Sequence, residues 1–283
     1  MDHRILGRLR CPVCAEPLAE ATAGTTRALR CPRGHSFDTA RQGYVNLLAG
    51  RTPHSGDSAD MVSARSDFLA AGHYDTVATA LASAATRVAP DDPYPLVVDA
   101  GAGTGHYLAA VLAALPDAHG LALDVSKPAL RRAARAHPRA AAALADTWQR
   151  LPLADRSVTV LLNVFAPRNG PEFHRVLDPA GALLVVTPAV DHLAELVDAL
   201  DLLRVDPDKA DRVAGSLGGH FAEESVTEHR ARLALTRAEV TTLVGMGPSA
   251  WHADPGRLAA RIAGLPEPTP VTLAVRLGVH RPR

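Results

Sequence analysis

The sequence predicts an open, mostly parallel α/β sheet preceded by a small metal-binding module. Two observations indicate this organisation. From residue 96 onward, short apolar segments alternate with segments of helical periodicity, which is typical of parallel strands covered by helices. Before them, all three cysteines of the chain lie with one histidine between residues 11 and 35. We therefore expect an N-terminal metal module followed by a larger α/β domain.

The metal module is predicted from the spacing of four ligands. Cys11 and Cys14 form one close pair, and Cys31 with His35 forms a second pair after sixteen intervening residues. Three thiolates and an imidazole suit tetrahedral zinc, and a closed Cys3His site has no open position for a substrate. Gly34 relaxes the backbone of the second turn. The alternative, three ordinary thiols and an unrelated histidine, is disfavoured because no other cysteine occurs. The zinc is therefore expected to be structural.

Seven strands and several helices are expected along the chain. The first five strands are expected to be parallel, and the last two, which alternate apolar with polar residues, form a late antiparallel pair. The predicted domains are a zinc module over 1–50, a linker and helical connector over 51–93, and an α/β domain over 94–283. The strands are expected at 96–99, 120–124, 141–145, 158–165, 182–187, 230–236 and 271–279, and the helices at 59–89, 106–115, 127–136 and 192–205.

Composition favours a cytoplasmic protein with an RNA contact. Clustered cysteines with metal spacing, no apolar signal segment and no membrane-length apolar stretch all favour the reducing cytosol. The formal net charge is zero, yet residues 1–51 hold eight arginines against four acidic residues, about +4. Arginine suits phosphate recognition, so we expect Arg30 and Arg33 of the module to contact nucleic acid. The alternative is an ordinary solvated surface.

A glycine-rich loop follows the first predicted strand of the α/β domain. Gly101, Gly103 and Gly105 come directly after Asp99, and Asp124 ends the next strand. Glycines there let the backbone turn sharply and approach a ligand, and a carboxylate ending the second strand is placed to bind ribose hydroxyls. The dinucleotide fingerprint has two residues before its third glycine, and this loop has one. An NAD site is therefore the weaker alternative.

This loop resembles that of the class I, Rossmann-like, S-adenosylmethionine-dependent methyltransferases. The resemblance implies that Asp99 and the three glycines line the cofactor, with the carboxylate facing the methionine amino end. It implies further that Asp124 binds the ribose and that Asp146, after the third strand, lies beside the adenine. The loop over 163–167 would cover the reacting methyl group.

Motifs over nearly the whole length resemble one narrower group, the bacterial 23S rRNA guanine-N1 methyltransferases, which pair a Cys3His zinc module with such a domain. The chain looks especially like the tylosin-resistance methyltransferase of antibiotic-producing actinomycetes. The resemblance implies that Tyr74, His106 and His192 contact the cofactor. It implies also a 23S rRNA stem-loop beside the macrolide tunnel as partner, a possible homodimer, and a role in resistance. The matching segments are Gly43-Tyr44-Val45-Asn46-Leu47-Leu48, Gly72-His73-Tyr74, Asn163-Val164-Phe165-Ala166-Pro167 and Gly247-Pro248-Ser249.

The mechanism expected from this resemblance is methyl transfer to N1 of a guanine held in line with the sulfonium. Asp57, Asn163 and His192 are candidates for holding the base edge, without a ranking, and the amide of Asn163 would position rather than deprotonate. Phe165 or Tyr74 would stack on an unpaired base. Loss of zinc is expected to unfold residues 1–50 without emptying the cofactor site. Two alternatives remain: a small-molecule methyltransferase of antibiotic biosynthesis and a catalytically silent zinc-dependent RNA-binding protein.

Overall fold

The computed structural model describes residues 1–23, 26–50, 54–90, 92–204, 206, 208–247 and 254–283. Several sequence predictions lie outside the described residues: positions 51–53 and 91 of the connector, Val205 at the end of a predicted helix, and Pro248-Ser249 of a matching segment. None of the helices in the described parts of the chain combines the length and apolarity that a bilayer crossing needs.

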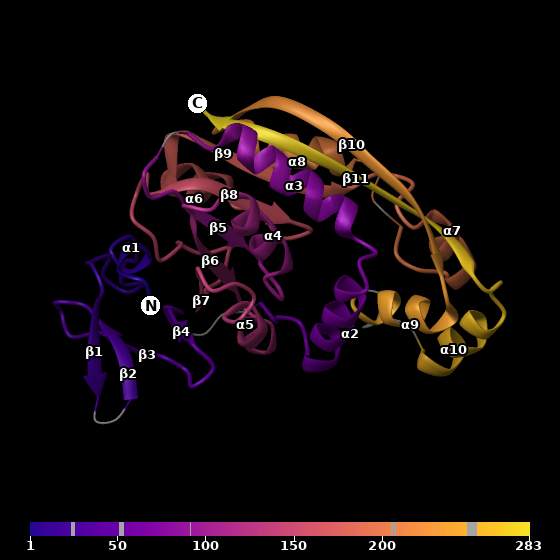
Figure 1. The fold of residues 1–283 in the computed structure, drawn as a ribbon, viewed down its shortest axis with the longest axis horizontal. Coiled ribbons are helices and arrows are strands. Elements are labelled where there is room, and N and C mark those ends of the chain that lie inside the picture. Colours follow the sequence, from indigo (N-terminus) through magenta and orange to yellow (C-terminus); the bar gives the residue numbers. More distant parts are fainter. Residues whose placement is uncertain (24–25, 51–53, 91, 205, 207, 248–253) are drawn as a thin grey trace.

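A sheet of eight strands in the order β10-β11-β9-β8-β5-β6-β7-β4 forms the centre of the molecule (Figure 1). The pairs among β4 to β9 are parallel, and β11 joins β9 and β10 in antiparallel fashion. The predicted parallel sheet with a late antiparallel pair is therefore confirmed. The strands are β4 Tyr44–Asn46, β5 Leu96–Ala100, β6 His119–Asp124, β7 Ala140–Leu144, β8 Val158–Val164, β9 Leu177–Pro188, β10 Phe221–Leu235 and β11 Thr269–Pro282.

The eighth strand, β4, corrects the prediction of seven. Tyr44 pairs with Ala142 of β7, so a segment expected in the zinc module completes one edge of the α/β sheet. A three-residue strand is too short to show alternation, so no sequence pattern predicted it. As a result, the first fifty residues extend into the α/β sheet.

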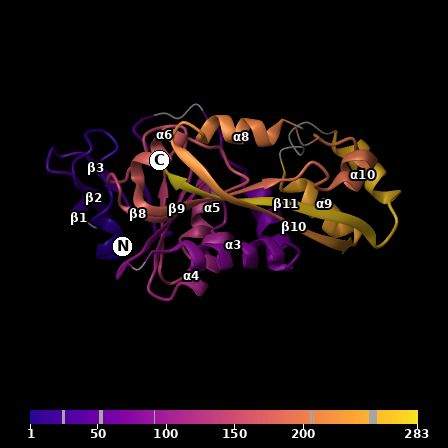
Figure 2. The same ribbon diagram turned by 90° about the horizontal axis from the view of Figure 1, so that it is seen from above.

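Two hydrophobic cores cover the two faces of the sheet, because successive strand residues point to opposite sides. Val97 belongs to the core beneath α3 and α4, whereas Val98 belongs to the opposite core, which also contains Phe173 of α6. Figure 2 shows α3 and α4 on one side of the sheet and α8 on the other. The helices are α1 His3–Leu6, α2 Ala59–Ala70, α3 Asp75–Val88, α4 His106–Ala114, α5 Lys127–Ala133, α6 Gly170–Val176, α7 Ala194–Leu200, α8 Lys209–Leu217, α9 Arg237–Gly245 and α10 Pro255–Ala263.

Helix boundaries differ from the predictions where the backbone turns left-handed. The helix expected over 192–205 is the shorter α7, because Leu193 (φ 57°) and Asp201 (φ 58°) flank it in the left-handed region. The helix expected over 59–89 is divided into α2 and α3 at Gly72, whose φ is 82°. These breaks place Tyr74 and His192 at helix starts.

The metal module packs on the sheet rather than standing apart from it. Its strands β1 Ala19–Ala23, β2 Thr26–Arg30 and β3 Ser36–Asp38 form a small antiparallel sheet. Leu9 and Phe37 of the module share a core with Leu121 of β6. The backbone N–H of Arg10 donates to the carbonyl oxygen of Pro152 at 2.9 Å. The module and the α/β sheet thus form one continuous core on this face.

Candidate metal centre and cofactor cavity

The four predicted zinc ligands converge. The ligand atoms of Cys11, Cys14, Cys31 and His35 lie within 4.8 Å of one another. The His35 Nδ1 atom is 3.6 Å from Cys11 Sγ and 3.3 Å from Cys31 Sγ, and the Sγ atoms of Cys14 and Cys31 are 3.7 Å apart. Tetrahedral zinc at ordinary bond lengths sets ligand separations of roughly 3.5–3.8 Å. The donor set therefore fits zinc, and it is closed.

The two turns that carry these ligands have left-handed residues. Gly34 has φ 87°, and its N–H donates to the Cys31 carbonyl oxygen at 2.9 Å, which confirms the conformational need for glycine there. In the first turn the corresponding residue is Ala15, with φ 61° and an N–H bond of 2.8 Å to the Cys11 carbonyl oxygen. The turn geometry thus makes both ligand pairs point at one position.

A cavity of about 780 Å³ opens at the carboxyl ends of β5, β6, β7 and β8. In parallel α/β sheets ligands bind at this edge, beside the point where the strand order reverses, here between β5 and β8. This volume is within the range that binds ligands of cofactor size. The predicted site residues in its wall are Asp57, Tyr74, Gly101, Gly103, His106, Asp124, Asp146 and His192.

The glycine loop is shaped for close approach. Gly101 has φ 87°, and a Cβ atom there would lie 2.4 Å from the Cβ of Ala166 in the loop after β8. Gly105 begins α4 with φ 80°, and a Cβ atom there would lie 3.0 Å from the Cα of Ala133 in α5. Neither position accepts a side chain without displacing its neighbours. Gly105 itself packs against α5 instead of lining the cavity.

Asp99 lies behind this loop as a buried, unpartnered carboxylate. The residue is 1% exposed, and neither carboxylate oxygen has a hydrogen-bond partner among the described residues. Burial, with the nearby charge of Asp124, raises the pKa of Asp99 to about 8. An unpartnered buried acid is costly, so a cationic ligand group is the missing partner that this position fits.

The next two predicted carboxylates also lie at strand ends, with partners. The carboxylate of Asp124 accepts from the N–H of Gly103 at 2.8 Å and of Ser126 at 2.7 Å. Burial raises the pKa of Asp124. Asp146 accepts from the N–H of Trp148 at 3.0 Å and lies 2.8 Å from His54 Nδ1. Each carboxylate oxygen has two lone pairs, so Asp124 retains capacity for ribose hydroxyls.

Tyr74 and His192 form a pair at the cavity wall. The Ala274 N–H donates to Nδ1 of His192 at 3.3 Å, so the ring proton lies on Nε2, which is 3.3 Å from the Tyr74 hydroxyl oxygen. Burial lowers the pKa of His192 to about 4. The imidazole is therefore neutral, and both of its nitrogens are engaged.

Phe165 lies against this pair. The residue is 41% exposed and has φ 52°, and its ring stacks on His192 with centroids 6.1 Å apart. The Tyr74 ring centroid lies 6.3 Å away. A strained backbone that holds an apolar ring open to solvent is typical of a functional site. The ring offers a flat surface for a ligand.

The structure shows which groups hold two of the three candidates for the base edge. Asn163 is fully buried and is not in the cavity wall; its amide nitrogen donates to the carbonyl oxygens of Ala100 at 3.1 Å and Pro167 at 2.7 Å. Asp57 lines the cavity and pairs with Arg65 of α2. Arg65 also donates to the Met246 carbonyl oxygen at 2.9 Å.

Sequence reasoning missed several residues of the cavity wall. Arg65, whose guanidinium lies near Gly103, and apolar residues of α7 and α9 such as Leu196 and Val244 also line the cavity. Arg65 sits on a helix without a motif around it, so the sequence carried no signal for its role. The apolar residues follow ordinary helical spacing, which is equally typical of a core.

Fold and site together are those of a class I S-adenosylmethionine-dependent methyltransferase that carries a zinc ribbon. Residues 9–55 match the family described as RlmA, N-terminal, and residues 97–184 match a methyltransferase domain. A putative 23S rRNA (guanine-N(1)-)-methyltransferase of Micromonospora griseorubida is 67% identical over the full length of both chains. The chain belongs to the family of 23S rRNA (guanine-N1)-methyltransferases.

A second relative and a solved structure are also similar to this chain. The 23S rRNA (guanine(748)-N(1))-methyltransferase of Streptomyces fradiae is 52% identical over 100% of this chain and 99% of its own. Among solved structures, a putative methyltransferase of Bacillus halodurans aligns with 71% of this chain and 97% of its own, at 16% identity and a TM-score of 0.47. The cofactor of this chain is S-adenosylmethionine, and its zinc is structural.

Proposed function

We propose that this protein methylates N1 of a guanine in a 23S rRNA stem-loop and uses S-adenosylmethionine as methyl donor. The observation that carries the proposal is the full-length 52% identity to the Streptomyces fradiae enzyme, whose name specifies guanine 748. We propose the corresponding guanine as target, and protection of the ribosome against tylosin-type macrolides as the outcome. The zinc module over 1–50 would bind the RNA. The connector over 51–93 would link it to the catalytic domain over 94–283.

The cavity residues are assigned to parts of the cofactor as follows. The unpartnered Asp99 carboxylate would bind the amino end, Asp124 would bind the ribose, and Asp146 would bind the adenine edge. Tyr74, with its hydroxyl proton left free by the His192 contact, would donate to a polar group of the methionine end. His106, at the start of α4, also lines the cavity and would contact the cofactor. Bound S-adenosylmethionine supplies the electrophilic methyl group.

The target base would stack on Phe165, the exposed ring at the cavity mouth. Guanine N1 carries a proton that must leave, and we propose Asp57, which lines the cavity, as the acceptor. His192 has no free nitrogen, and Asn163 faces the backbone of the loop after β8. The guanidinium of Arg65 would hold the Asp57 carboxylate in position. Asn163 is therefore a positioning residue.

The test is primer extension on unmethylated 23S rRNA after incubation with protein and S-adenosylmethionine. N1 methylation blocks Watson–Crick pairing, so reverse transcriptase should stop at a single guanine of the stem-loop. A stop at a neighbouring guanine would change the assigned nucleotide only. No stop, with cofactor binding intact, would favour the alternative of a small-molecule acceptor. No cofactor binding would favour a silent RNA-binding protein.

Resistance and oligomeric state need separate measurements. Expression in a tylosin-sensitive host should raise the inhibitory concentration of tylosin, and an Asp99→Asn variant should not. The homodimer remains a prediction, which light scattering on the purified protein would test.

A further inference from the structure

The arginines of the zinc module are mostly engaged within the protein. Arg27 lies 3.6 Å from Glu20, and Arg33 lies 3.6 Å from Glu16. Arg4 stacks over Tyr94, Arg8 donates to the Tyr94 carbonyl oxygen, and Arg10 donates to carbonyl oxygens of its own turn. Within the described part of the module, only Arg30 and Arg41 have neither an ion pair nor a hydrogen bond from the side chain. The charge count of this module therefore overstates its capacity for phosphates.

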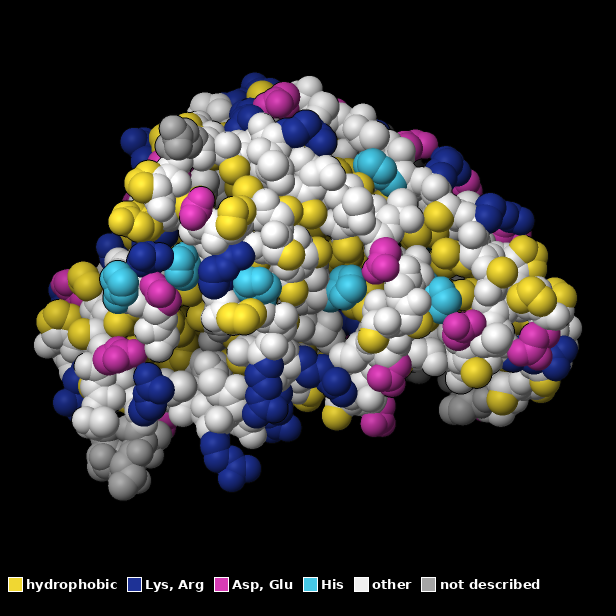
Figure 3. Space-filling model, viewed as in Figure 1, with side chains coloured by type: hydrophobic (Ala, Val, Ile, Leu, Met, Phe, Trp, Pro, Cys, Tyr) yellow, Lys and Arg dark blue, Asp and Glu magenta, His cyan; other side chains and the backbone are white. Residues whose placement is uncertain are grey.

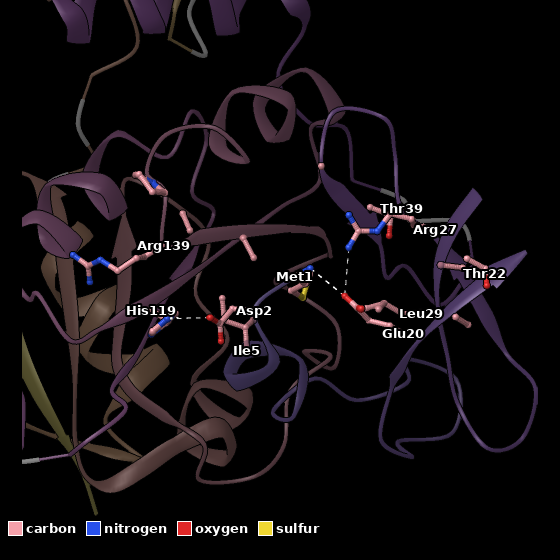
Figure 4. A pocket seen from close by; sticks show the side chains of 16 residues that line it. Met1, Asp2, Ile5, Glu20, Thr22, Arg27, Leu29, Thr39, His119 and Arg139 are labelled. Carbon is pink, nitrogen blue, oxygen red and sulfur yellow. Dashed lines mark hydrogen bonds and ion pairs between the residues drawn. The ribbon is translucent and has the colours of Figure 1, made fainter. Parts of the chain in front are cut away.

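The hollow between the module and the sheet is likewise neutralised. This cavity of about 580 Å³ lies beside β6 and β7 (Figure 4). Glu20 binds the N-terminal amino group of Met1 at 3.2 Å and also Arg27, and His119 lies 3.3 Å from Asp2. Its charged groups bind one another, so it offers little to a polyanion.

Helix α5 and the turn after it are different. Lys127, Arg131, Arg132 and Arg135 are all exposed, and across the described chain none has an ion pair or a side-chain hydrogen bond. Residues 127–145 contain no Asp or Glu. Arg139 turns inward and donates to carbonyl oxygens at the end of α4, among them that of Leu115 at 2.8 Å. Four unpaired cations therefore share one short segment.

These cations lie in a row that starts at the cofactor cavity. Lys127 and Arg131 are four residues apart on α5, a rise of about 6 Å. Arg132 follows in the last turn of the helix, and Arg135 lies in the turn after it. Lys127 lines a small hollow together with Asp57 and Val125, which also line the cofactor cavity. Figure 3 shows dark-blue side chains gathered at the lower centre of the molecule, where α5 lies in Figure 1.

The other end of the row reaches the zinc module. A Cβ atom on Gly43, in the turn between β3 and β4, would lie 3.7 Å from the Cβ of Ala134 just after α5. Arg41, in the same turn, is exposed and unpaired within the described structure. We name Lys127, Arg131, Arg132, Arg135 and Arg41 the α5 basic surface. It joins the module to the mouth of the cavity.

We propose that the α5 basic surface binds the phosphates of the RNA strand that leads to the target guanine, an inference that rests on the proposed function. Four guanidinium groups and one ammonium group, unpaired within the described structure and without interspersed carboxylates, favour a polyanion over a protein surface of mixed charge. Phosphate contacts fix register, while the cavity selects the base. The surface sets which nucleotide of the strand reaches Phe165.

The test is the salt dependence of RNA binding, measured by fluorescence anisotropy on a synthetic hairpin with the 23S rRNA sequence around the target guanine. S-adenosylhomocysteine replaces the methyl donor so that no turnover occurs. Removing two phosphate contacts in Arg131→Ala/Arg135→Ala should lower the slope of log affinity against log salt by about 1.4–1.8. The affinity penalty of the variant should then be about tenfold larger at 50 mM than at 200 mM KCl.

Two controls make the result specific. Arg87→Ala/Arg257→Ala removes the same charge from exposed arginines on α3 and α10 and should keep the wild-type slope. Arg131→Lys/Arg135→Lys should keep it too. A wild-type slope in the double-alanine variant, or an equal loss in the α3/α10 control, would overturn the proposal.

The proposed function is tested separately by methyl transfer from wild-type protein to 23S rRNA. If wild type leaves no methyl group on the RNA, the proposed function fails, whatever the hairpin shows. If wild type methylates and Arg131→Ala/Arg135→Ala keeps both its KM for RNA and its salt slope, only the α5 basic surface is wrong. Unchanged affinity for S-adenosylhomocysteine shows that the variant is folded.

Discussion

Replacement of Asp99 by asparagine is expected to stabilise the ligand-free protein while it weakens cofactor binding. The carboxylate is buried without a partner, and burial with the charge of Asp124 raises its pKa from 3.8 to about 8. The asparagine amide has the same shape as the carboxylate but carries no charge, so the folded protein avoids the cost of a buried charge. The amide also cannot pair with the cationic amino end of the cofactor.

The magnitude follows from proton linkage. Between pH 3.8 and about 8 the folded protein keeps a proton on Asp99 that the unfolded chain has lost. Folding therefore takes up a proton, and the free energy of unfolding falls as pH rises, by about 1.4 kcal/mol per pH unit, with the slope fading near pH 8. From pH 6 to pH 8 the stability of Asp99→Asn relative to wild type should rise by about 2 kcal/mol.

The assay is urea unfolding of both proteins at pH 6, 7 and 8 with zinc present. The control is Asp155→Asn, because the hydrogen bond from Arg175 lowers the pKa of that exposed carboxyl and both states are ionised over this range. The control should show no pH trend. If the difference in unfolding free energy between Asp99→Asn and wild type did not change with pH, the reasoning would be refuted.

A calorimetric titration completes this test. Binding of the cationic amino end needs the ionised carboxylate, so S-adenosylhomocysteine should release on the order of one proton at pH 7 from wild type. The measured heat of binding should then vary with the ionisation enthalpy of the buffer for wild type, and it should not vary for Asp99→Asn. Wild-type affinity in Asp99→Asn would remove Asp99 from the cofactor site.

Three other changes test the site and the module. In the same urea assay, Gly101→Ala should lower the free energy of unfolding by about 2–5 kcal/mol, because left-handed strain adds to the clash with Ala166. The control Gly50→Ala, at φ 102° with open space around it, should cost only about 1–2 kcal/mol. Phe165→Leu should lower kcat/KM for RNA about tenfold through lost base stacking and leave cofactor affinity within twofold. The core that the module shares with the sheet replaces the expectation from the sequence that zinc loss unfolds residues 1–50 alone. Zinc chelation should instead lower the Tm of the whole chain in one calorimetric transition, and separate transitions would contradict this.

The sequence predicted the positions where local pattern and chemistry coincide. The strands from β5 to β9 are apolar runs bounded by turns, so their order was readable, and the parallel order places Asp99, Asp124 and Asp146 at one edge. The four zinc ligands are chemically distinctive and close in sequence. For these residues, spacing alone specifies which side chains meet.

What the sequence did not show depends on contacts between distant segments. The Tyr74–His192 contact joins the start of α3 to the segment before α7. The Asp57–Arg65–Met246 link joins the loop before α2, α2 itself and the end of α9, and no periodicity encodes either contact. The left-handed Leu193, which shortens α7, is a residue type that ordinarily continues a helix. Tertiary packing overrides local propensity at these positions.

The shared core explains why a methyltransferase that needs no metal for chemistry keeps a closed zinc site. A module of about fifty residues buries too little apolar surface to hold its own turns, and a structural metal supplies that stability. The module is joined to the sheet beside the cavity, through β4 on β7 and through Arg10 bonded to Pro152, six residues after Asp146. Zinc therefore holds the turn that carries Arg41 at a fixed distance from α5 and from the cavity mouth. If the α5 basic surface binds RNA phosphates as proposed, those contacts would carry register and the cavity would carry the chemistry. A fixed distance between the two would then select one guanine among several in a stem-loop.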